Sequence, residues 1–340
     1  MKISSLCAYF VVALLFASPY SYANLPKSAQ FAKDASNAYG YLIGQSFTLE
    51  RIESQYPEMA GQVIIAKASF NAAFPSVQSR IREMLLDVYG KEMFEDLELK
   101  LVDAVEENLA SIPMTRSLAE QFINTVRNRA DGVIESPALE IILATTYLEK
   151  PAEEVRDGFY QAFESENHPK AQGVELGLRL PVSWVAEDGR RPNIVQKWRN
   201  FGGHGPTTIM LDVRDVGADI SDTEIRDIVE SGEIRSFLPE GATLQDAGLT
   251  QLDAQTAYVV DYLYRQDIGE TVVMMQVRHY QLYFNGKGVG VMCMSAAGVG
   301  DGAQSQSSIK AAHALILAES EKQSGVCRQV AHSLVLYQAW

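Results

Sequence analysis

The sequence predicts an α+β protein, in which an N-terminal all-α helical domain is followed by a domain with a mainly antiparallel sheet covered by helices. Apolar residues recur at three- and four-residue spacing from Asn24 to about Asn167, which is typical of helices. Beyond His168 the period changes to two, which is typical of half-buried strands. Asn285-Gly286 stands between two strand-like segments and favours a tight antiparallel hairpin.

The N-terminal pattern indicates a helical bundle or an irregular helical array, and a solenoid of helix pairs stays open as an alternative. Gly90 and Gly132 are expected to end two of the helices, and Thr115 or Ser117 to cap another. The expected helices are Ser28–Gly44, Thr48–Gln55, Glu58–Phe74, Ser76–Tyr89, Glu92–Ile112, Ser117–Ala130, Pro137–Leu148 and Ala152–Glu166.

The change of period at His168-Pro169-Lys170 predicts the seam between a helical domain, 24–167, and an α+β domain, 168–340. The expected strands are Val174–Leu180, Ile194–Phe201, Thr207–Val216, Thr243–Leu252, Thr256–Tyr264, Thr271–Phe284 and Gly288–Ala296. The expected helices of this half are Ser221–Ser231, capped by Ser221 or Asp222, Ser305–Lys322 and a final short one within Val326–Leu336.

The first residues, 1–23, have the pattern of a cleavable signal peptide. Lys2 supplies a positive charge, Leu6–Ala17 an apolar core, and Ser21-Tyr22-Ala23 the small-x-Ala cleavage pattern. An uncleaved N-terminal anchor is the alternative. We therefore expect a periplasmic protein, or one secreted to the exterior, that begins near Asn24 and has no stable membrane span after cleavage.

The net charge disfavours two classes of partner, and the number of cysteines favours a disulfide. The formal net charge of −14 argues against nucleic-acid partners, which need a basic surface, and against anionic lipid surfaces. Cys7 lies in the predicted signal, so Cys293 and Cys327 remain in the mature chain. In an oxidising periplasm two such cysteines favour a structural disulfide, with a redox or nucleophilic thiol as the alternative.

One stretch carries a resemblance to a known family. Leu180-Pro181 is followed by Ser183-Trp184, a polar turn and Arg191–Lys197, and then by the glycine-rich loop Phe201–Pro206 and a strand. This order resembles the PsbP/DcrB-like superfamily of exported proteins, over the C-terminal half only. The resemblance implies an α/β/α sandwich. It implies no catalytic residues, because the superfamily shares no catalytic motif.

A basic cluster inside the matching stretch is the leading candidate for binding. Arg190, Arg191 and Lys197 stand close to Trp184 in sequence and could hold an acidic or aromatic ligand, or an acidic partner surface. A solvated turn with the tryptophan in the core is the alternative. His204 in the glycine-rich loop could contact an anion, and a mobile connection between strands is the alternative there.

The remaining polar residues predict no catalytic or metal site. The five histidines lack zinc-ligand spacing, and the chain has no Gly-x-Ser-x-Gly nucleophile motif. Asp212, Asp215 and Asp219 crowd one strand end and could hold a hard cation, although an exposed acidic edge is the competing interpretation. We expect no cofactor and no resident metal.

Three classes of function are consistent with these observations. The first is an exported, non-catalytic envelope protein that acts through macromolecular binding or assembly, with another envelope protein as partner. The second is a periplasmic protein that binds a small ligand or a cation. The third is a hydrolase with a site assembled from distant residues. The sequence leaves the oligomeric state open.

Overall fold

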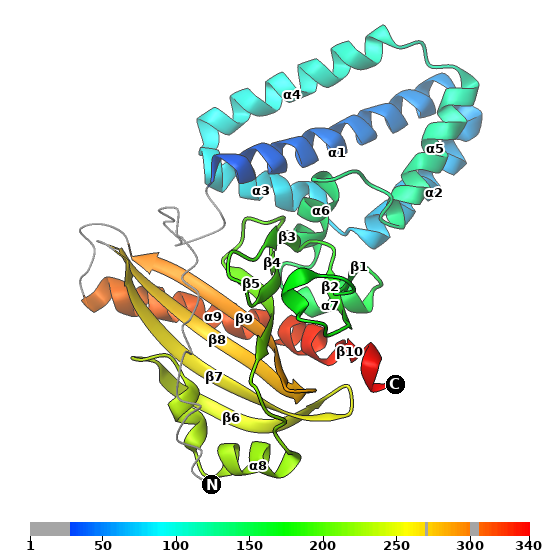
Figure 1. Cartoon of the computed structure of the whole chain (residues 1–340). Coiled ribbons are helices and arrows are strands. Elements are labelled where there is room, and N and C mark those ends of the chain that lie inside the picture. Colours follow the sequence, from blue (N-terminus) through cyan, green and yellow to red (C-terminus); the bar gives the residue numbers. More distant parts are fainter. Residues whose placement is uncertain (1–27, 269–270, 300–305) are drawn as a thin grey trace. The chain divides into compact units, whose positions relative to one another are not determined.

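The computed structural model describes residues 28–268, 271–299 and 306–340. The predicted signal peptide lies outside the described residues. The described chain forms two compact units, which divide between Leu148 and Glu149. The first is entirely helical and the second contains both helices and strands, so the protein is α+β as expected (Figure 1).

The helical unit is built around its first helix. Its helices are α1 (Ala29–Gln55), α2 (Ala60–Ala73), α3 (Val77–Tyr89), α4 (Lys91–Ser111), α5 (Arg116–Ala130) and α6 (Ala138–Thr146). One continuous α1 replaces the two helices expected up to Gln55, because its buried side chains continue through Gln45 and Thr48. A glycine such as Gly44 costs a helix only about 1 kcal/mol, which this burial offsets. Thr115 caps α5 through its side chain, as one of the two expected caps.

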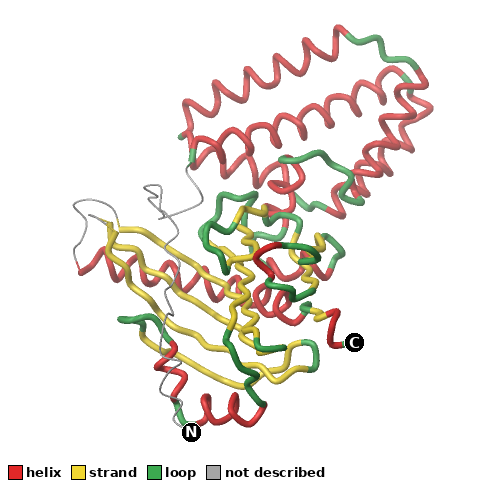
Figure 2. The backbone as a smooth tube through the Cα atoms, viewed as in Figure 1, coloured by secondary structure: helices red, strands yellow, loops and turns green. Residues whose placement is uncertain are grey.

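The second unit is organised around a seven-stranded sheet in which every neighbouring pair is antiparallel (Figure 2). Its order is β3-β4-β5-β9-β8-β7-β6, and a small sheet has the order β1-β2-β10. The strands are β1 (Tyr160–Glu164), β2 (Leu176–Pro181), β3 (Val185–Asp188), β4 (Ile194–Arg199), β5 (Thr207–Asp215), β6 (Thr243–Leu252), β7 (Gln255–Ile268), β8 (Thr271–Phe284), β9 (Lys287–Val299) and β10 (Val335–Leu336).

Helices cover both faces of the large sheet, which gives the α/β/α arrangement. One face packs against α9 (Gln306–His332) through two apolar cores, one around Cys293 and one around Ile316. The other face packs against α8 (Asp222–Glu230) around Tyr262 and Ile225. Figure 1 shows α9 lying along the sheet beside β8 and β9.

Two local predictions are confirmed in detail. Asn285 and Gly286 both have positive φ, 50° and 69°, as a two-residue hairpin turn of type I′ requires, and they join β8 to β9. Ser221 caps α8 in a reciprocal box with Glu224, in which each side chain bonds the other residue's backbone N–H.

The change from helix to strand comes earlier than the expected seam at His168. The helix expected over Ala152–Glu166 is wrong beyond Arg156, where α7 (Pro151–Arg156) ends. Gly158 then adopts a φ of 95°, and β1 pairs with β2 in the second unit. At the other end, α9 runs through Val326 to His332, so the last apolar segment is mostly a continuation of this helix.

Candidate functional site

The expected basic cluster does not form one accessible patch. Trp184 is 1% exposed and belongs to the apolar core, as the alternative interpretation held. Lys197 is buried and its ammonium contacts the carboxylate of Glu187, which also accepts a hydrogen bond of 2.9 Å from Arg199. Arg190 is exposed on the turn between β3 and β4 and Arg191 beside it is half-buried. A binding role of these residues stays a prediction.

The glycine-rich loop that contains His204 is held by backbone hydrogen bonds. The N–H of His204 donates to the carbonyl of Phe201 over 3.1 Å, and that of Gly205 to Asn200 over 2.9 Å. The side-chain oxygen of Asn200 also accepts from Thr207 N–H over 3.0 Å. The loop is therefore a structured connection between β4 and β5 with a half-buried His204, and a ligand role for the imidazole stays a prediction.

The acidic strand end does not gather into one cluster. Asp212 is fully buried and accepts a hydrogen bond of 2.7 Å from Arg214, while its other oxygen lies 3.7 Å from His279. Burial lowers the pKa of His279 to about 4, although Asp212 acts to raise it, so this imidazole is neutral at pH 7. Asp215 instead pairs with Lys287 at the surface. Among the described residues no group of acidic, His and Cys side chains could hold a metal ion.

A polar pocket of about 180 Å³ lies between α9 and the sheet face that this helix covers. It exists because β8 changes character along that face. Val272 and Met274 belong to one apolar core and Tyr280 to the other, whereas Gln276 and Arg278 lie between them and line the pocket. The buried Ser295 of β9 contributes to the same wall.

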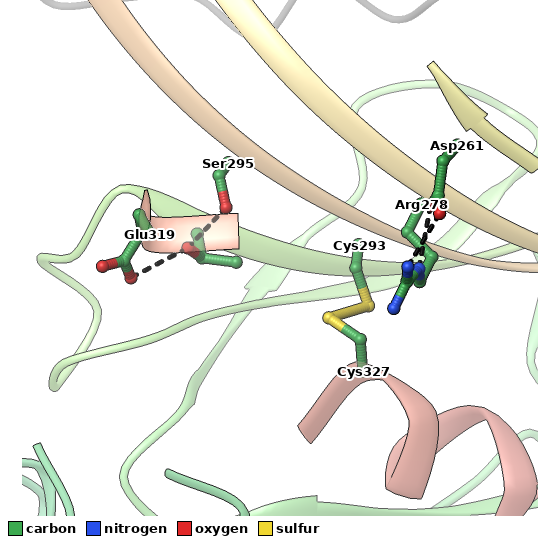
Figure 3. The surroundings of a disulfide bond; sticks show 7 residues. Asp261, Arg278, Cys293, Ser295, Glu319 and Cys327 are labelled. Carbon is green, nitrogen blue, oxygen red and sulfur yellow. Dashed lines mark hydrogen bonds and ion pairs between the residues drawn. A yellow bond between two sulfur atoms is a disulfide. The ribbon is translucent and has the colours of Figure 1, made fainter. Parts of the chain in front are cut away.

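The disulfide, whose surroundings are drawn in Figure 3, has both of its cysteines in the lining of this pocket. Cys293 of β9 is bonded to Cys327 of α9, as the sequence predicts, with their Cα atoms 6.0 Å apart. That separation is normal for a disulfide. The covalent bond therefore joins the strand and the helix that form opposite walls of the pocket.

The charged groups of the pocket are arranged in pairs and networks. Arg278 donates two hydrogen bonds to Asp261, of 2.8 and 2.7 Å, and these hold the pKa of the guanidinium above its usual value. Next to the pocket, Glu319 of α9 accepts from Asn200, Thr207 and Gln323 over 3.2, 3.1 and 3.0 Å. Figure 3 shows Glu319 and Arg278 on either side of the disulfide.

Two glutamines that the sequence did not single out, Gln276 and Gln323, also line the pocket. Gln276 and Gln323 are 5% and 6% exposed. The amide nitrogen of Gln276 donates to Gln245 over 2.9 Å, and that of Gln323 donates to Glu319. The side-chain oxygen of each glutamine is buried without a hydrogen-bond partner among the described residues. The only sequence signal was a polar residue at a position where the strand or helix period predicts an apolar one.

A second pocket, of about 380 Å³, lies in the helical unit between α1, α2 and α3. Several of its polar side chains are bonded to one another or to their neighbours. Arg82 donates to both oxygens of Glu98 over 2.9 and 2.8 Å, Gln45 accepts from Arg129 over 2.9 Å, and Ser46 donates to Gln78 over 3.4 Å. These contacts stabilise the helical packing and leave the pocket beside the disulfide as the stronger candidate site.

Comparison with solved structures finds two that this chain is similar to over about half of its length. The chain is similar to the solution structure of cyanobacterial PsbP (CyanoP) from Synechocystis sp. PCC 6803, with 14% identity and a TM-score of 0.33, over 52% of this chain and 92% of that one. It is also similar to the crystal structure of LpqN, involved in cell envelope biogenesis of Mycobacterium tuberculosis, with 16% identity and a TM-score of 0.31, over 54% and 95%.

Two further comparisons, with family models and with curated proteins, found no match. None of the helices in the described ranges is both long and apolar enough to cross a membrane.

Proposed function

We propose that this protein is exported to the cell envelope and works there as a non-catalytic binding protein. The observation that carries the proposal is the Cys293–Cys327 disulfide, because such bonds form and persist in oxidising compartments. The signal-like pattern of residues 1–23 supports the same location, the periplasm first and the exterior as the alternative. Ser295, the serine of the pocket wall, is buried and hydrogen-bonded to Thr207, which favours a structural role over that of a hydrolase nucleophile.

Export is tested by fractionation and a thiol count. The protein expressed with residues 1–23 is expected in the periplasmic fraction. Its measured mass should be that of a chain that begins at Asn24, and it should have no free thiols under denaturing, non-reducing conditions. The matched control lacks residues 1–23 and is expected in the cytoplasm with Cys293 and Cys327 reduced. A full-length chain that stays in the cytoplasm, or that is exported with two free thiols, contradicts the proposal.

The binding partner expected first is another envelope protein. Support comes from α2, which is apolar on more than its packed side, with Ile64 and Ile65 exposed to 59% and 56%. Apolar surface of this kind is common where proteins bind one another. A photo-crosslinking residue at Ile65 should capture a partner that one at the exposed Glu107 of α4 does not. The product should form again from the two purified proteins, and its absence contradicts a protein partner on α2.

The second candidate function is the binding of a small polar ligand, favoured by the pocket beside the disulfide. Pockets with a few converging polar groups are the usual places for such ligands. Here those groups come from four strands, β6 to β9, and from α9, and two of them carry buried side-chain oxygens without partners among the described residues.

A further inference from the structure

The two buried glutamine oxygens define what the pocket lacks. In Gln323 the amide orientation is fixed, because the opposite orientation would direct its oxygen at the carboxylate of Glu319. The oxygen of Gln323 therefore lacks a hydrogen-bond donor among the described residues, and the oxygen of Gln276, whose amide nitrogen donates to Gln245, lacks one as well. Leaving a buried acceptor without a donor costs about 1–3 kcal/mol. A complementary ligand must supply N–H or O–H groups that donate to these two oxygens.

The charge of the surroundings favours a cation. Asp261 and Arg278 neutralise each other through two hydrogen bonds. Glu321 is exposed in the pocket lining and adds one carboxylate. Glu319 adds a second, and it accepts hydrogen bonds from the neutral side chains of Asn200, Thr207 and Gln323. A positively charged donor is attracted by both, and the attraction is strengthened away from bulk water.

The size of the pocket limits the ligand to a small molecule. A volume of about 180 Å³ is smaller than the roughly 300–1,000 Å³ of pockets that hold drug-sized ligands. Leu317 and the disulfide sulfurs add apolar surface to the wall, which suits a short carbon chain.

We propose that the pocket between α9 and the sheet, beside the Cys293–Cys327 disulfide, binds a small organic cation through a protonated amine that donates to the side-chain oxygens of Gln276 and Gln323. This rests on the proposed function, because it names the ligand class that the binding protein holds. The carboxylates of Glu319 and Glu321 balance the charge of the amine, and its carbon chain lies against Leu317.

Calorimetric titration of the oxidised chain that begins at Asn24 tests the proposal. The probe is 1,4-diaminobutane, and its matched control is 1,4-butanediol, a neutral molecule of the same length. We expect the diamine to bind and the diol to bind at least tenfold more weakly, because a hydrogen bond to a charged group is worth more than one to a neutral group. Calcium chloride is titrated as a third probe.

Three variants locate the site. Gln323→Leu removes one buried oxygen and is expected to weaken diamine binding about tenfold or more. Glu321→Gln changes only an exposed rim charge, keeps the fold, and is expected to weaken binding about threefold. Gln329→Leu, on the same helix but outside the pocket lining, is expected to leave binding unchanged. Tryptophan fluorescence verifies that each variant is folded.

The proposal is overturned if the folded wild type does not bind the diamine, if the diol binds equally well, or if only calcium binds. It is also overturned if Gln323→Leu and Glu321→Gln bind as tightly as wild type. An exported, oxidised protein that does not bind the diamine contradicts this inference alone. A chain that is not exported contradicts the proposed function, whatever the titration shows.

Discussion

Removing the Cys293–Cys327 disulfide should destabilise the α+β unit while leaving its native packing almost unchanged. Both cysteines lie in the apolar core, at 5% and 3% exposure, and their bond closes a segment with a sequence separation of 34. Two perturbations break it. One is reduction of the wild type, which keeps both sulfur atoms in place, and the other is the double variant Cys293→Ala/Cys327→Ala.

The expected loss follows from the length of the closed loop. A crosslink over this separation reduces the entropy of the unfolded chain by an amount worth about 4 kcal/mol at 25 °C. Urea unfolding of a unit this large has a slope of about 2–3 kcal/mol per molar, so the midpoint should fall by about 1.5 M. The alanine variant should lose a little more, because two small cavities replace the sulfur atoms.

Tryptophan fluorescence measures this unit selectively. The chain has three tryptophans, and all of them, Trp184, Trp198 and Trp340, lie in the α+β unit. Trp184 and Trp198 are buried in the same core as the disulfide. The control is the unfolding of the helical unit, followed by circular dichroism of the same chain. Its urea transition should not change on reduction, because this unit does not contain the disulfide. A urea midpoint that is the same with and without reductant, in a protein shown to have no free thiols beforehand, would refute the reasoning.

Two further predictions concern buried groups of the same unit. Burial raises the pKa of Glu154 to about 7, despite hydrogen bonds from Ser183, so its stabilising contribution is complete below pH 4.5 and is lost as the pH rises through 7. Glu154→Gln should abolish this loss of about 3 kcal/mol between pH 5 and 8, measured by urea unfolding, and an unchanged pH profile would contradict it. A Cβ on Gly290 would lie 2.6 Å from both Asp212 and His279, so Gly290→Ala should cost about 1–3 kcal/mol. Gly248→Ala, where a Cβ meets open space, is the control, and equal stability of the two variants would contradict the prediction.

Six of the seven strands of the large sheet were predictable because local signals specify them, whereas the short β3 (Val185–Asp188) was not predicted. Thr243–Leu252 and Thr271–Phe284 have the observed bounds of β6 and β8, and the Asn285-Gly286 turn fixes the pairing of β8 with β9. A strand that buries only one face has apolar residues at every second position, and this pattern can be recognised in the sequence. The resemblance over the C-terminal half then supplied the α/β/α arrangement, which periodicity alone did not provide.

The first strand was missed because its signal is tertiary. Tyr160–Glu164 comes shortly after the short helix α7, and its residues alternate between exposed and half-buried, with none fully buried. The segment becomes a strand by pairing with β2. Periodicity over so short a segment fits a continued helix as well as a strand. Only Gly158, with its positive φ, marked the break, and a single glycine is a weak signal.

The candidate site could not be predicted because its residues are separated along the chain and each is ordinary by itself. Gln276 is one of several polar residues in β8, and Gln323 is one of many on the amphipathic α9. The basic cluster around Arg191 attracted attention because its members are neighbours in sequence. In the structure Lys197 is instead paired with Glu187 and buried. Basic residues that are close together in the sequence therefore did not form a basic patch on the surface.

The disulfide and the polar pocket are related through stability. Two buried carbonyl oxygens without partners, on Gln276 and Gln323, together cost about 2–6 kcal/mol in the protein without a ligand. The crosslink beside them contributes about 4 kcal/mol, an amount of the same size. A helix–sheet interface can therefore keep a polar gap at its centre when a covalent bond holds the helix next to that gap. Because disulfides persist in oxidising compartments, the pocket is expected to be stable in such a compartment and weakened in a reducing one.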